Sequence, residues 1–228
     1  MKRIKVSNNV IRRLPRYLRK LDELRASGVN RVSSSELGGM LGLTASQIRQ
    51  DFSCFGEFGQ QGYGYNVTAL RDQIAAILGT DRGFSAILVG TGNIGHALMG
   101  NFCFSDWGFT LSAAFDIDPK IVGSTFNGVT VRSMEELEGY LAENHIDVAV
   151  LTVPRGAAVA VAELLRANGI RAIWNFTNVE LLEPNSDVLV ENIHFSDSLL
   201  SLSYFLSERN DEEAARAARL ERLARSKE

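Results

Sequence analysis

Apolar residues in the first third of the chain recur at the spacing of an α-helix. The segment from Leu14 to Ala26 predicts a helix with one buried face, lined by Leu14, Tyr17, Leu18, Leu21 and Leu24. Pro15 fits the first turn of a helix and not its interior, so we expect the main body of this helix to begin near Pro15. Gly28 is expected to end it.

Two short helices are predicted next, each opened by a capping signal. The Ser33–Leu41 segment begins with Ser followed three residues later by Glu, which is the spacing of a capping box. The Thr44–Cys54 segment begins in the same way, with Thr followed by Gln, and Gly42 with Leu43 would form a tight turn between the two helices. Two short helices joined in this way resemble a helix-turn-helix.

A DNA-reading motif of this kind would place its second helix in the major groove. The residues that would then face base edges or phosphates are Ala45, Ser46, Gln47 and Arg49. Arg49 can pair bidentately with guanine, and Gln47 with adenine. The alternative, a helical hairpin that only builds structure, stays open at this point.

Aromatic residues alternate with glycine and small polar residues from Phe55 to Tyr65. This pattern predicts a β-hairpin with a tight glycine turn, which would form a wing able to enter the minor groove. The alternative is a glycine-rich loop that connects two halves of the protein. A further helix with an apolar stripe is predicted from the N-cap Asn66 to Gly79, and residues 79–83 are expected to form a linker.

The chain then changes to the pattern of a nucleotide-binding fold. The apolar run Ser85–Val89 predicts a buried strand, followed directly by Gly90-Thr91-Gly92-Asn93-Ile94-Gly95 and by a helix that reaches about Phe104. The run Leu111–Phe115 predicts a second strand that ends at Asp116, 21 residues beyond Gly95. Strand, glycine motif, helix, strand and acid together form the dinucleotide fingerprint.

Each position of the fingerprint has a physical reason. Gly90 allows the tight turn, Gly92 lets the backbone approach a pyrophosphate at the helix N-terminus, and Gly95 lets the helix pack closely on the strand. Asp116 can accept hydrogen bonds from the adenosine ribose and would repel a 2′-phosphate. The expected cofactor is therefore NAD(H) and not its phosphorylated form.

Strands and helices continue to alternate along the rest of this domain. Strands are predicted at 129–131, 147–151 and 171–175, with helices at 134–144 and 155–168. This order predicts an α/β fold with a doubly wound parallel sheet and helices on both faces. The residues at its ligand edge would be Gly90, Asp116, Asn175 and the loop Thr152-Val153-Pro154.

Charge is distributed unevenly between the two parts of the chain. Residues 1–80 hold 12 basic and 6 acidic side chains, whereas the remaining residues hold 12 basic and 21 acidic ones. A basic first third predicts that this part meets a polyanion, although a solvated basic surface is an open alternative. The hydrophobic content of 45% excludes a wholly disordered chain.

Other classes of protein are disfavoured by what the sequence lacks. It contains no apolar run of about 18 residues, and no secretory signal follows its basic N-terminus. Two cysteines, Cys54 and Cys103, suit packing positions better than a disulfide framework or a zinc site, so no metal is expected. We expect a cytoplasmic protein with no membrane partner.

Catalysis is not expected. A dehydrogenase needs a proton donor near the nicotinamide, and the sequence offers His96 beside the phosphate loop, His145 in a surface loop and His194 before the last helix. Of these only His194 is a plausible donor. Little chain is left for a substrate domain, so the combination points to a regulator that binds DNA and senses NAD(H).

Several motifs are similar to those of the Rex family, the bacterial redox-sensing transcriptional repressors. They extend from about Ile11 to Leu206. They are Arg13-Leu14-Pro15 with Tyr17-Leu18-Arg19, Gln47-Ile48-Arg49 with Asp51, Phe55-Gly56-Glu57-Phe58-Gly59, Gly64-Tyr65, Gly90 to Gly95, Phe115-Asp116-Ile117-Asp118-Pro119, Leu151-Thr152-Val153-Pro154 and Asn175-Phe176.

The resemblance implies a homodimer in which each chain has a winged-helix domain, a Rossmann domain and a C-terminal helix swapped onto the partner. It implies repression through inverted-repeat operators in double-stranded DNA, with NADH closing the dimer and releasing DNA while NAD+ is compatible with binding. The domains would be residues 1–80, 81–194, the swapped helix 195–208 and a polar tail 209–228. The tail is expected to be a solvated helix or a frayed end.

The motifs and the resemblance together define three sets of candidate residues. For DNA they are Arg13, Ala45, Ser46, Gln47, Arg49, Gln50, Gln60, Gln61 and Tyr63. For the cofactor they are Gly90, Thr91, Gly92, Asn93, Ile94, Gly95, Asp116, Asp118, Ile121, Thr152, Val153, Pro154, Asn175, Thr177 and Phe195, the last of which would reach the nicotinamide of the partner subunit. The candidates for a redox-dependent latch between subunits are Arg19, Asn101 and His194.

The sequence departs from the family's usual pattern at several of these positions. Gln50, Gln60 and Gln61 stand where basic residues are usual, which would remove phosphate contacts. Thr177-Asn178 replaces the usual Ala-Pro, and Asn101 and His194 replace the Tyr and Asp of the latch. His194 could also make the response pH-dependent, although a satisfied structural histidine is the favoured interpretation.

Three alternatives to a redox-responsive repressor follow. One is a DNA-binding paralogue with NAD(H) as a structural ligand and an altered redox response. Another is a small oxidoreductase. A third is a CoA-binding regulator, against which Asp116 argues because CoA carries a 3′-phosphate.

Overall fold

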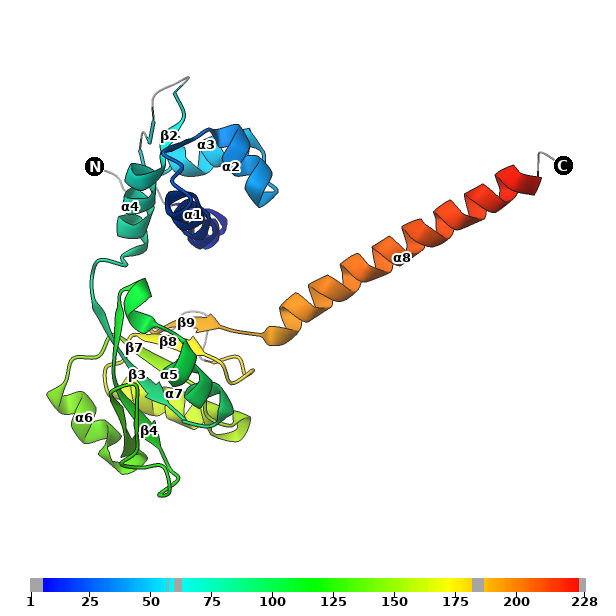
Figure 1. Ribbon diagram of the computed structural model, residues 1–228. Coiled ribbons are helices and arrows are strands. Elements are labelled where there is room, and N and C mark those ends of the chain that lie inside the picture. Colours follow the sequence, from blue (N-terminus) through cyan, green and yellow to red (C-terminus); the bar gives the residue numbers. More distant parts are fainter. Residues whose placement is uncertain (1–5, 57, 60–62, 182–186, 226–228) are drawn as a thin grey trace. The chain divides into compact units, whose positions relative to one another are not determined.

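The computed structural model describes residues 6–56, 58–59, 63–181 and 187–225, and the side chains of these as far as Arg216. The chain divides into two compact units (Figure 1). The first unit is Met1–Gly83 together with Phe104–Phe109, and the second is Phe84–Cys103 with Thr110–Glu228. A short 3-10 helix, η1 (Phe104–Trp107), thus belongs to the first unit. In the sequence it comes after residues 84–103, which belong to the second unit.

The first unit is mainly helical. Its elements are α1 (Asn8–Ala26), β1 (Arg31–Val32), α2 (Ser34–Leu41), α3 (Ala45–Ser53), β2 (Tyr65–Asn66) and α4 (Val67–Leu78). Both predicted caps of the central pair are present, because Ser33 and Glu36 form a capping box and the Thr44 hydroxyl accepts from the backbone N–H of Gln47. Buried residues from all four helices form one hydrophobic cluster around Tyr17, Leu21 and Ile48.

The predicted start of α1 is wrong. The helix begins at Asn8, with the Ser7 hydroxyl accepting from the backbone N–H of Val10, and Pro15 lies inside it. A proline in this place leaves the carbonyl of Ile11 without its usual helical donor. The buried face from Val10 to Leu24 compensates, since it continues through the proline without a break.

The two short strands of the first unit pair with each other. Val32 lies opposite Tyr65 and Arg31 opposite Asn66 in an antiparallel ladder. The sequence did not predict β1. Tyr65, the last residue of the predicted Phe55–Tyr65 hairpin, pairs with Val32 of β1, a strand that lies outside that hairpin. The tip of that hairpin, including Gln60 and Gln61, lies outside the described residues, and the hairpin itself stays a prediction.

The second unit is built on a seven-stranded sheet in the order β5-β6-β4-β3-β7-β8-β9. The strands are β3 (Phe84–Val89), β4 (Phe109–Asp116), β5 (Thr125–Phe126), β6 (Val129–Ser133), β7 (Val148–Leu151), β8 (Ala172–Asn175) and β9 (Leu189–Asn192). In this sheet β5 and β6 form an antiparallel hairpin, while β7, β8 and β9 continue the sheet in parallel from β3. The predicted parallel sheet is confirmed, and β5 and β9 extend it at its two edges.

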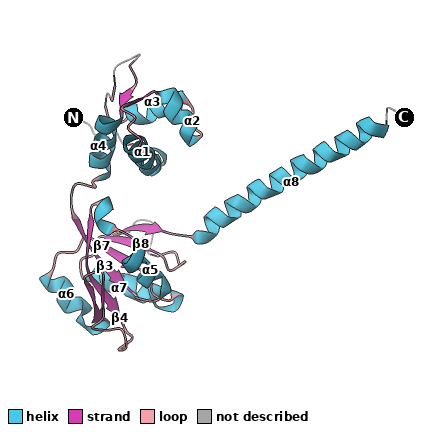
Figure 2. Cartoon of the chain, in the orientation of Figure 1, coloured by secondary structure: helices cyan, strands magenta, loops and turns pink. Residues whose placement is uncertain are grey.

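Helices connect the strands of this sheet, as Figure 2 shows. They are α5 (Asn93–Asn101), α6 (Leu137–Glu143) and α7 (Ala158–Ala167), with the 3-10 turns η2 (Met134–Glu136) and η3 (Arg155–Ala157) at the starts of α6 and α7. Leu137 of α6 and Ala162 of α7 share a buried cluster with Ile87 and Phe115 of the sheet. Right-handed crossovers running in opposite directions from β3 and from β7 place α5 and α7 on opposite faces.

The last helix is longer than the predicted Phe195–Leu206. α8 (Phe195–Arg225) is one uninterrupted helix of 31 residues, so the polar tail continues it (Figure 2). Its large apolar side chains are exposed in the single chain, with Leu199 66% and Leu202 53% accessible. In the described part of the chain, no helix has the length and hydropathy that a membrane crossing requires.

Candidate functional site

The glycine loop between β3 and α5 is packed too tightly for larger residues. A Cβ on Gly90 would lie 2.8 Å from the backbone nitrogen of Val153, and φ at Gly90 is +94°. A Cβ on Gly95 would lie 2.1 Å from the carbonyl oxygen of Gly90. The two glycines therefore have the structural roles predicted for them, and Gly92 forms the N-cap of α5 with no side-chain hydrogen bond.

This arrangement leaves the first backbone N–H groups of α5 uncapped by a side chain at the carboxyl edge of the sheet. Thr91, Asn93 and Ile94 belong to the same turn, and Ile94 is 37% exposed. A helix N-terminus of this kind favours an anion such as a pyrophosphate, because its N–H groups and its dipole both attract negative charge.

Asp116 at the end of β4 is tied to the glycine loop. Its Oδ2 accepts from the backbone nitrogen of Thr91 at 2.5 Å and from the Thr91 hydroxyl at 2.7 Å, and its Oδ1 accepts from the nitrogen of Asp118 at 2.9 Å. Burial opposes ionisation, but these hydrogen bonds outweigh it and hold the pKa of Asp116 below its usual value. Much of its acceptor capacity is thus used inside the protein, a partnership that the sequence analysis missed.

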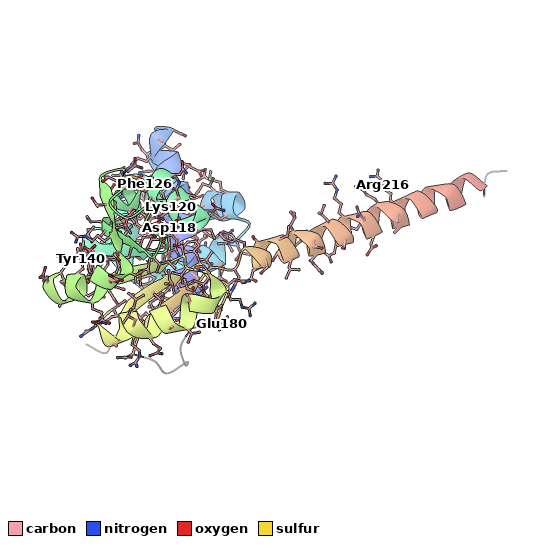
Figure 3. The ribbon with its side chains drawn as sticks, turned by 90° about the horizontal axis from the view of Figure 1, so that it is seen from below. Asp118, Lys120, Phe126, Tyr140, Glu180 and Arg216 are labelled. Carbon is pink, nitrogen blue, oxygen red and sulfur yellow. The ribbon has the colours of Figure 1, made fainter. Side chains whose placement is uncertain are left out.

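Two further cofactor candidates, Asp118 and Ile121, follow Asp116 in the chain. Asp118 and Lys120 are close together after β4, and Asp118 Oδ1 accepts from the backbone nitrogen of Lys120 (Figure 3). Ile121 follows them and donates its N–H to the carbonyl of Asp118.

The opposite side of the loop is formed by the ends of β7 and β8. The Thr152 hydroxyl donates to the Gly90 carbonyl at 2.5 Å, which joins the loop Thr152–Pro154 to the glycine loop. Asn175 and Thr177 are both buried, and Asn175 Oδ1 accepts from the nitrogen and the hydroxyl of Thr177. Asn175 Nδ2 donates to Asn192 Oδ1 at 2.7 Å, so these candidates shape the edge through bonds of their own.

The three latch candidates are in different environments. Asn101, in the last turn of α5, donates to the carbonyl of Ala97. His194, just before α8, has Nδ1 2.9 Å from Asn178 Oδ1 and Nε2 3.3 Å from a carboxylate oxygen of Glu180. Arg19 is an exposed residue of α1 in the first unit.

In the first unit, α3 presents a polar face. Ile48 and Phe52 are buried, while Ser46, Arg49 and Gln50 are exposed. The Arg49 guanidinium donates to the hydroxyl of Ser34 on α2 at 3.0 Å. The pattern of Ile48 and Phe52 inward, with these polar residues outward, is the one expected for a recognition helix.

The other DNA candidates are less uniform. Tyr63 is 70% exposed, whereas Ala45 and Gln47 are half-buried. Arg13 is engaged by two hydrogen bonds to Asp51, a buried carboxylate to which the sequence analysis gave no role.

Both cysteines were expected to pack inside the protein. Cys54 is half-buried, with its thiol 3.5 Å from the carbonyl of Gln50. Cys103 is exposed, so for this residue the expectation is wrong.

Two family models match this chain, one within its first unit and one mainly within its second. The sequence model of a family described as "Putative DNA-binding protein N-terminus" matches residues 5–53. A model described as "CoA binding domain" matches residues 81–179.

Curated relatives are similar over nearly the whole chain. The redox-sensing transcriptional repressor Rex of Clostridium beijerinckii is 52% identical over 203 residues, which cover 89% of this chain and 96% of that protein. The Rex protein of Clostridium tetani is 47% identical, covering 92% of this chain and 99% of its own length.

Solved structures of a Rex-family repressor called RSP are similar as well. RSP in complex with β-NADH has a TM-score of 0.85 and 43% identity, covering 92% of this chain and 98% of its own. RSP in complex with β-NAD+ and operator DNA has a TM-score of 0.83 and 45% identity, covering 93% of this chain and 97% of its own. The chain described here therefore belongs to the Rex family of redox-sensing transcriptional repressors.

Proposed function

We propose that this protein is a DNA-binding transcriptional repressor that senses the ratio of NADH to NAD+. NADH closes its homodimer and releases operator DNA, whereas NAD+ permits DNA binding. The observation that carries the proposal is that one chain joins an exposed polar face on α3 to a glycine loop fixed by Asp116. RSP, of which NADH and operator complexes are known, supports both halves of the proposal.

The cofactor would lie along the carboxyl edge of the sheet. The glycine loop and the start of α5 would hold the pyrophosphate, and Asp116 with Asp118 and Ile121 would surround the adenosine end. Thr152, Val153, Pro154, Asn175 and Thr177 would border the nicotinamide end, joined by Phe195 from the partner subunit. NAD+ and NADH differ only at the nicotinamide, so discrimination belongs to this second group.

CoA is a weaker candidate for this site, even though one matching family model is named for it. CoA carries a 3′-phosphate on its ribose. The ionised carboxylate of Asp116 at the ribose end would repel that phosphate. We therefore propose NAD(H) as the ligand.

A regulatory role needs no catalytic residue, and we assign none. His96 packs edge-to-face on Phe126, with ring centroids 4.7 Å apart. His145 bonds to Asp147, and His194 contacts Asn178 and Glu180. Each histidine thus has a partner within the protein, which favours a structural role over proton transfer.

The homodimer is proposed from α8. Apolar side chains such as Leu199, Leu202 and Phe205 are more than half exposed in the single chain, and a helix swapped onto the partner subunit would bury them. The domains proposed are residues 1–80 for DNA, 81–194 for the nucleotide, 195–208 for the swapped helix and 209–228 for the tail. A cytoplasmic location fits a protein that binds DNA and NADH.

The first test is calorimetric titration of the purified dimer with NADH and, separately, with NAD+. Much tighter binding of NADH supports redox sensing. Equal affinities, or tighter NAD+, favour the second candidate, a DNA-binding paralogue that holds NAD(H) as a structural ligand. The contacts of His194 with Asn178 and Glu180 favour that candidate, because they occupy a latch residue within its own chain.

A further inference from the structure

A buried carboxylate connects the proposed recognition helix to α1. Asp51 on α3 has no exposed surface, and both of its oxygens accept hydrogen bonds. Arg13 donates from Nε to Oδ2 at 2.6 Å and from Nη2 to Oδ1 at 2.7 Å, and the Tyr17 hydroxyl donates to Oδ2 at 2.5 Å. The fourth donor is Gln47, one turn earlier on α3, whose Nε2 lies 2.8 Å from Oδ1.

These four donors keep Asp51 ionised. Burial disfavours the charged form, but the hydrogen bonds from Arg13, Tyr17 and Gln47 outweigh burial and hold the pKa of Asp51 below its usual value. The same contacts raise the pKa of Arg13, while burial and the Asp51 contact raise the pKa of Tyr17. A buried carboxylate whose two oxygens both accept hydrogen bonds constrains the geometry of its donors strongly.

Ionisation of Asp51 determines the orientation of the Gln47 amide. A carboxylate can only accept hydrogen bonds, so the nitrogen of the amide must face Asp51. The exchange of amide oxygen and nitrogen that is often ambiguous in glutamine is therefore excluded here. The carbonyl oxygen of Gln47 is directed away from Asp51, on a residue that lies half-buried beside the exposed Ser46.

We infer that Asp51 is a positioning residue for DNA recognition, which makes Gln47 present a hydrogen-bond acceptor to a base edge. The carbonyl oxygen of Gln47 then accepts from an exocyclic amino group, N6 of adenine or N4 of cytosine, and disfavours a base that presents an acceptor at that place. This inference rests on the proposed function, because it assumes that α3 reads operator DNA. It gives the Arg13 and Tyr17 contacts a purpose beyond holding α1 on α3.

The first experiment locates the base pair that Gln47 reads. The wild-type dimer and Gln47→Ala are used to select binding sequences from a library of random-sequence duplexes. We expect Gln47→Ala to lose a preference of about 5- to 150-fold at one base pair of each half-site, the range for one specific base contact. The matched control Gln73→Ala, an exposed glutamine of α4, should keep that preference.

The second experiment tests the acceptor directly with the wild-type protein. At that base pair, adenine is replaced by purine or cytosine by 2-pyrimidinone, each of which lacks the amino group. Loss of affinity with the amine-free base is the expected result. Unchanged affinity for the amine-free duplex would overturn the inference.

The third experiment connects the effect to Asp51. The side-chain amide of Asp51→Asn can both donate and accept, so it no longer fixes the orientation of the Gln47 amide. The base preference should then weaken at the same base pair as in Gln47→Ala. The double variant should show no further weakening. A merely structural role would weaken binding to all duplexes equally. Unchanged NADH affinity of a variant shows that its second unit is intact. The base-analogue experiment uses only the wild-type protein, so it does not depend on whether a variant folds.

The outcomes separate the inference from the proposed function. Enrichment of no sequence by the wild-type protein would contradict the proposed function and the inference together. A clear wild-type motif that Gln47→Ala keeps at every position would overturn the inference alone.

Discussion

Thr91 donates both its backbone N–H and its hydroxyl to the same carboxylate oxygen of Asp116, over 2.5 and 2.7 Å. The acid at the end of β4 therefore holds the second residue of the glycine loop in place. In the proposed function, Asp116 would act on the nucleotide in two ways, by accepting hydrogen bonds from the ribose and by fixing the shape of the glycine loop.

The Asp116 contact predicts a clear effect of removing its charge. In Asp116→Asn one oxygen is replaced by a donor, which faces either the two donors of Thr91 or the N–H of Asp118. Leaving such groups unpaired costs about 1–3 kcal/mol, so NADH affinity measured by calorimetry should fall about tenfold or more. Thr91→Val keeps the N–H bond and should lose less. Wild-type NADH affinity in Asp116→Asn would show that the hydrogen bonds between Asp116 and Thr91 do not support nucleotide binding.

Gly95 and Gly100 offer a matched pair of substitutions on one helix. A Cβ at Gly95 would be 2.1 Å from the Gly90 carbonyl, whereas a Cβ at Gly100 meets nothing within 4 Å. Gly95→Ala should lower the free energy of unfolding by about 1–3 kcal/mol through overpacking and abolish NADH binding. Gly100→Ala should retain both properties. Denaturant unfolding and calorimetry test the pair, and equal behaviour of the two variants would contradict close packing at Gly95.

Arg49 is predicted to read the operator. Arg49→Ala should abolish specific DNA binding, because each half-site loses a contact worth about 1–3 kcal/mol, while NADH binding remains intact. Arg82→Ala removes a positive charge from the same unit at an exposed linker position and serves as the control. Competition between operator and random duplexes measures selectivity. Operator selectivity that survives Arg49→Ala would remove α3 as the recognition helix.

The exposed apolar face of α8 predicts how the dimer is held. Leu202→Glu places a charge where a swapped helix would be buried, and we expect sedimentation velocity to show monomers where the wild-type protein is dimeric. Asn210→Glu adds the same charge on the same helix beyond the apolar stretch and should remain dimeric. A dimer unaffected by Leu202→Glu would place the interface elsewhere.

The sequence was informative where the signal is local. The capping pairs at Ser33 and Thr44 lie three residues apart, and the glycine motif follows its strand directly, so neighbouring residues determine these elements. The meeting of the strand ends at one edge of the sheet was predicted for the same reason. The carboxyl ends of parallel strands must meet, and Gly90 and Asn175 follow or end such strands.

Elements that depend on distant partners could not be predicted. β1 is two residues long and exists because Val32 pairs with Tyr65, and β9 exists because it pairs with β8. Asp51 looks like an ordinary helical acid until Arg13, 38 residues earlier, is placed against it. Asp116 was predicted as a free ribose acceptor because its partner Thr91 is 25 residues away in the chain.

The central claim is that NADH, and not NAD+, removes this protein from DNA. The most direct measurement is the dissociation constant of the dimer for its selected duplex, by fluorescence anisotropy, with saturating NADH and with saturating NAD+. We predict binding at least about tenfold weaker with NADH, since a ligand shifts a two-state protein only through its differential affinity for the two states. Equal DNA affinity with the two nucleotides would contradict redox sensing and leave NAD(H) as a structural ligand.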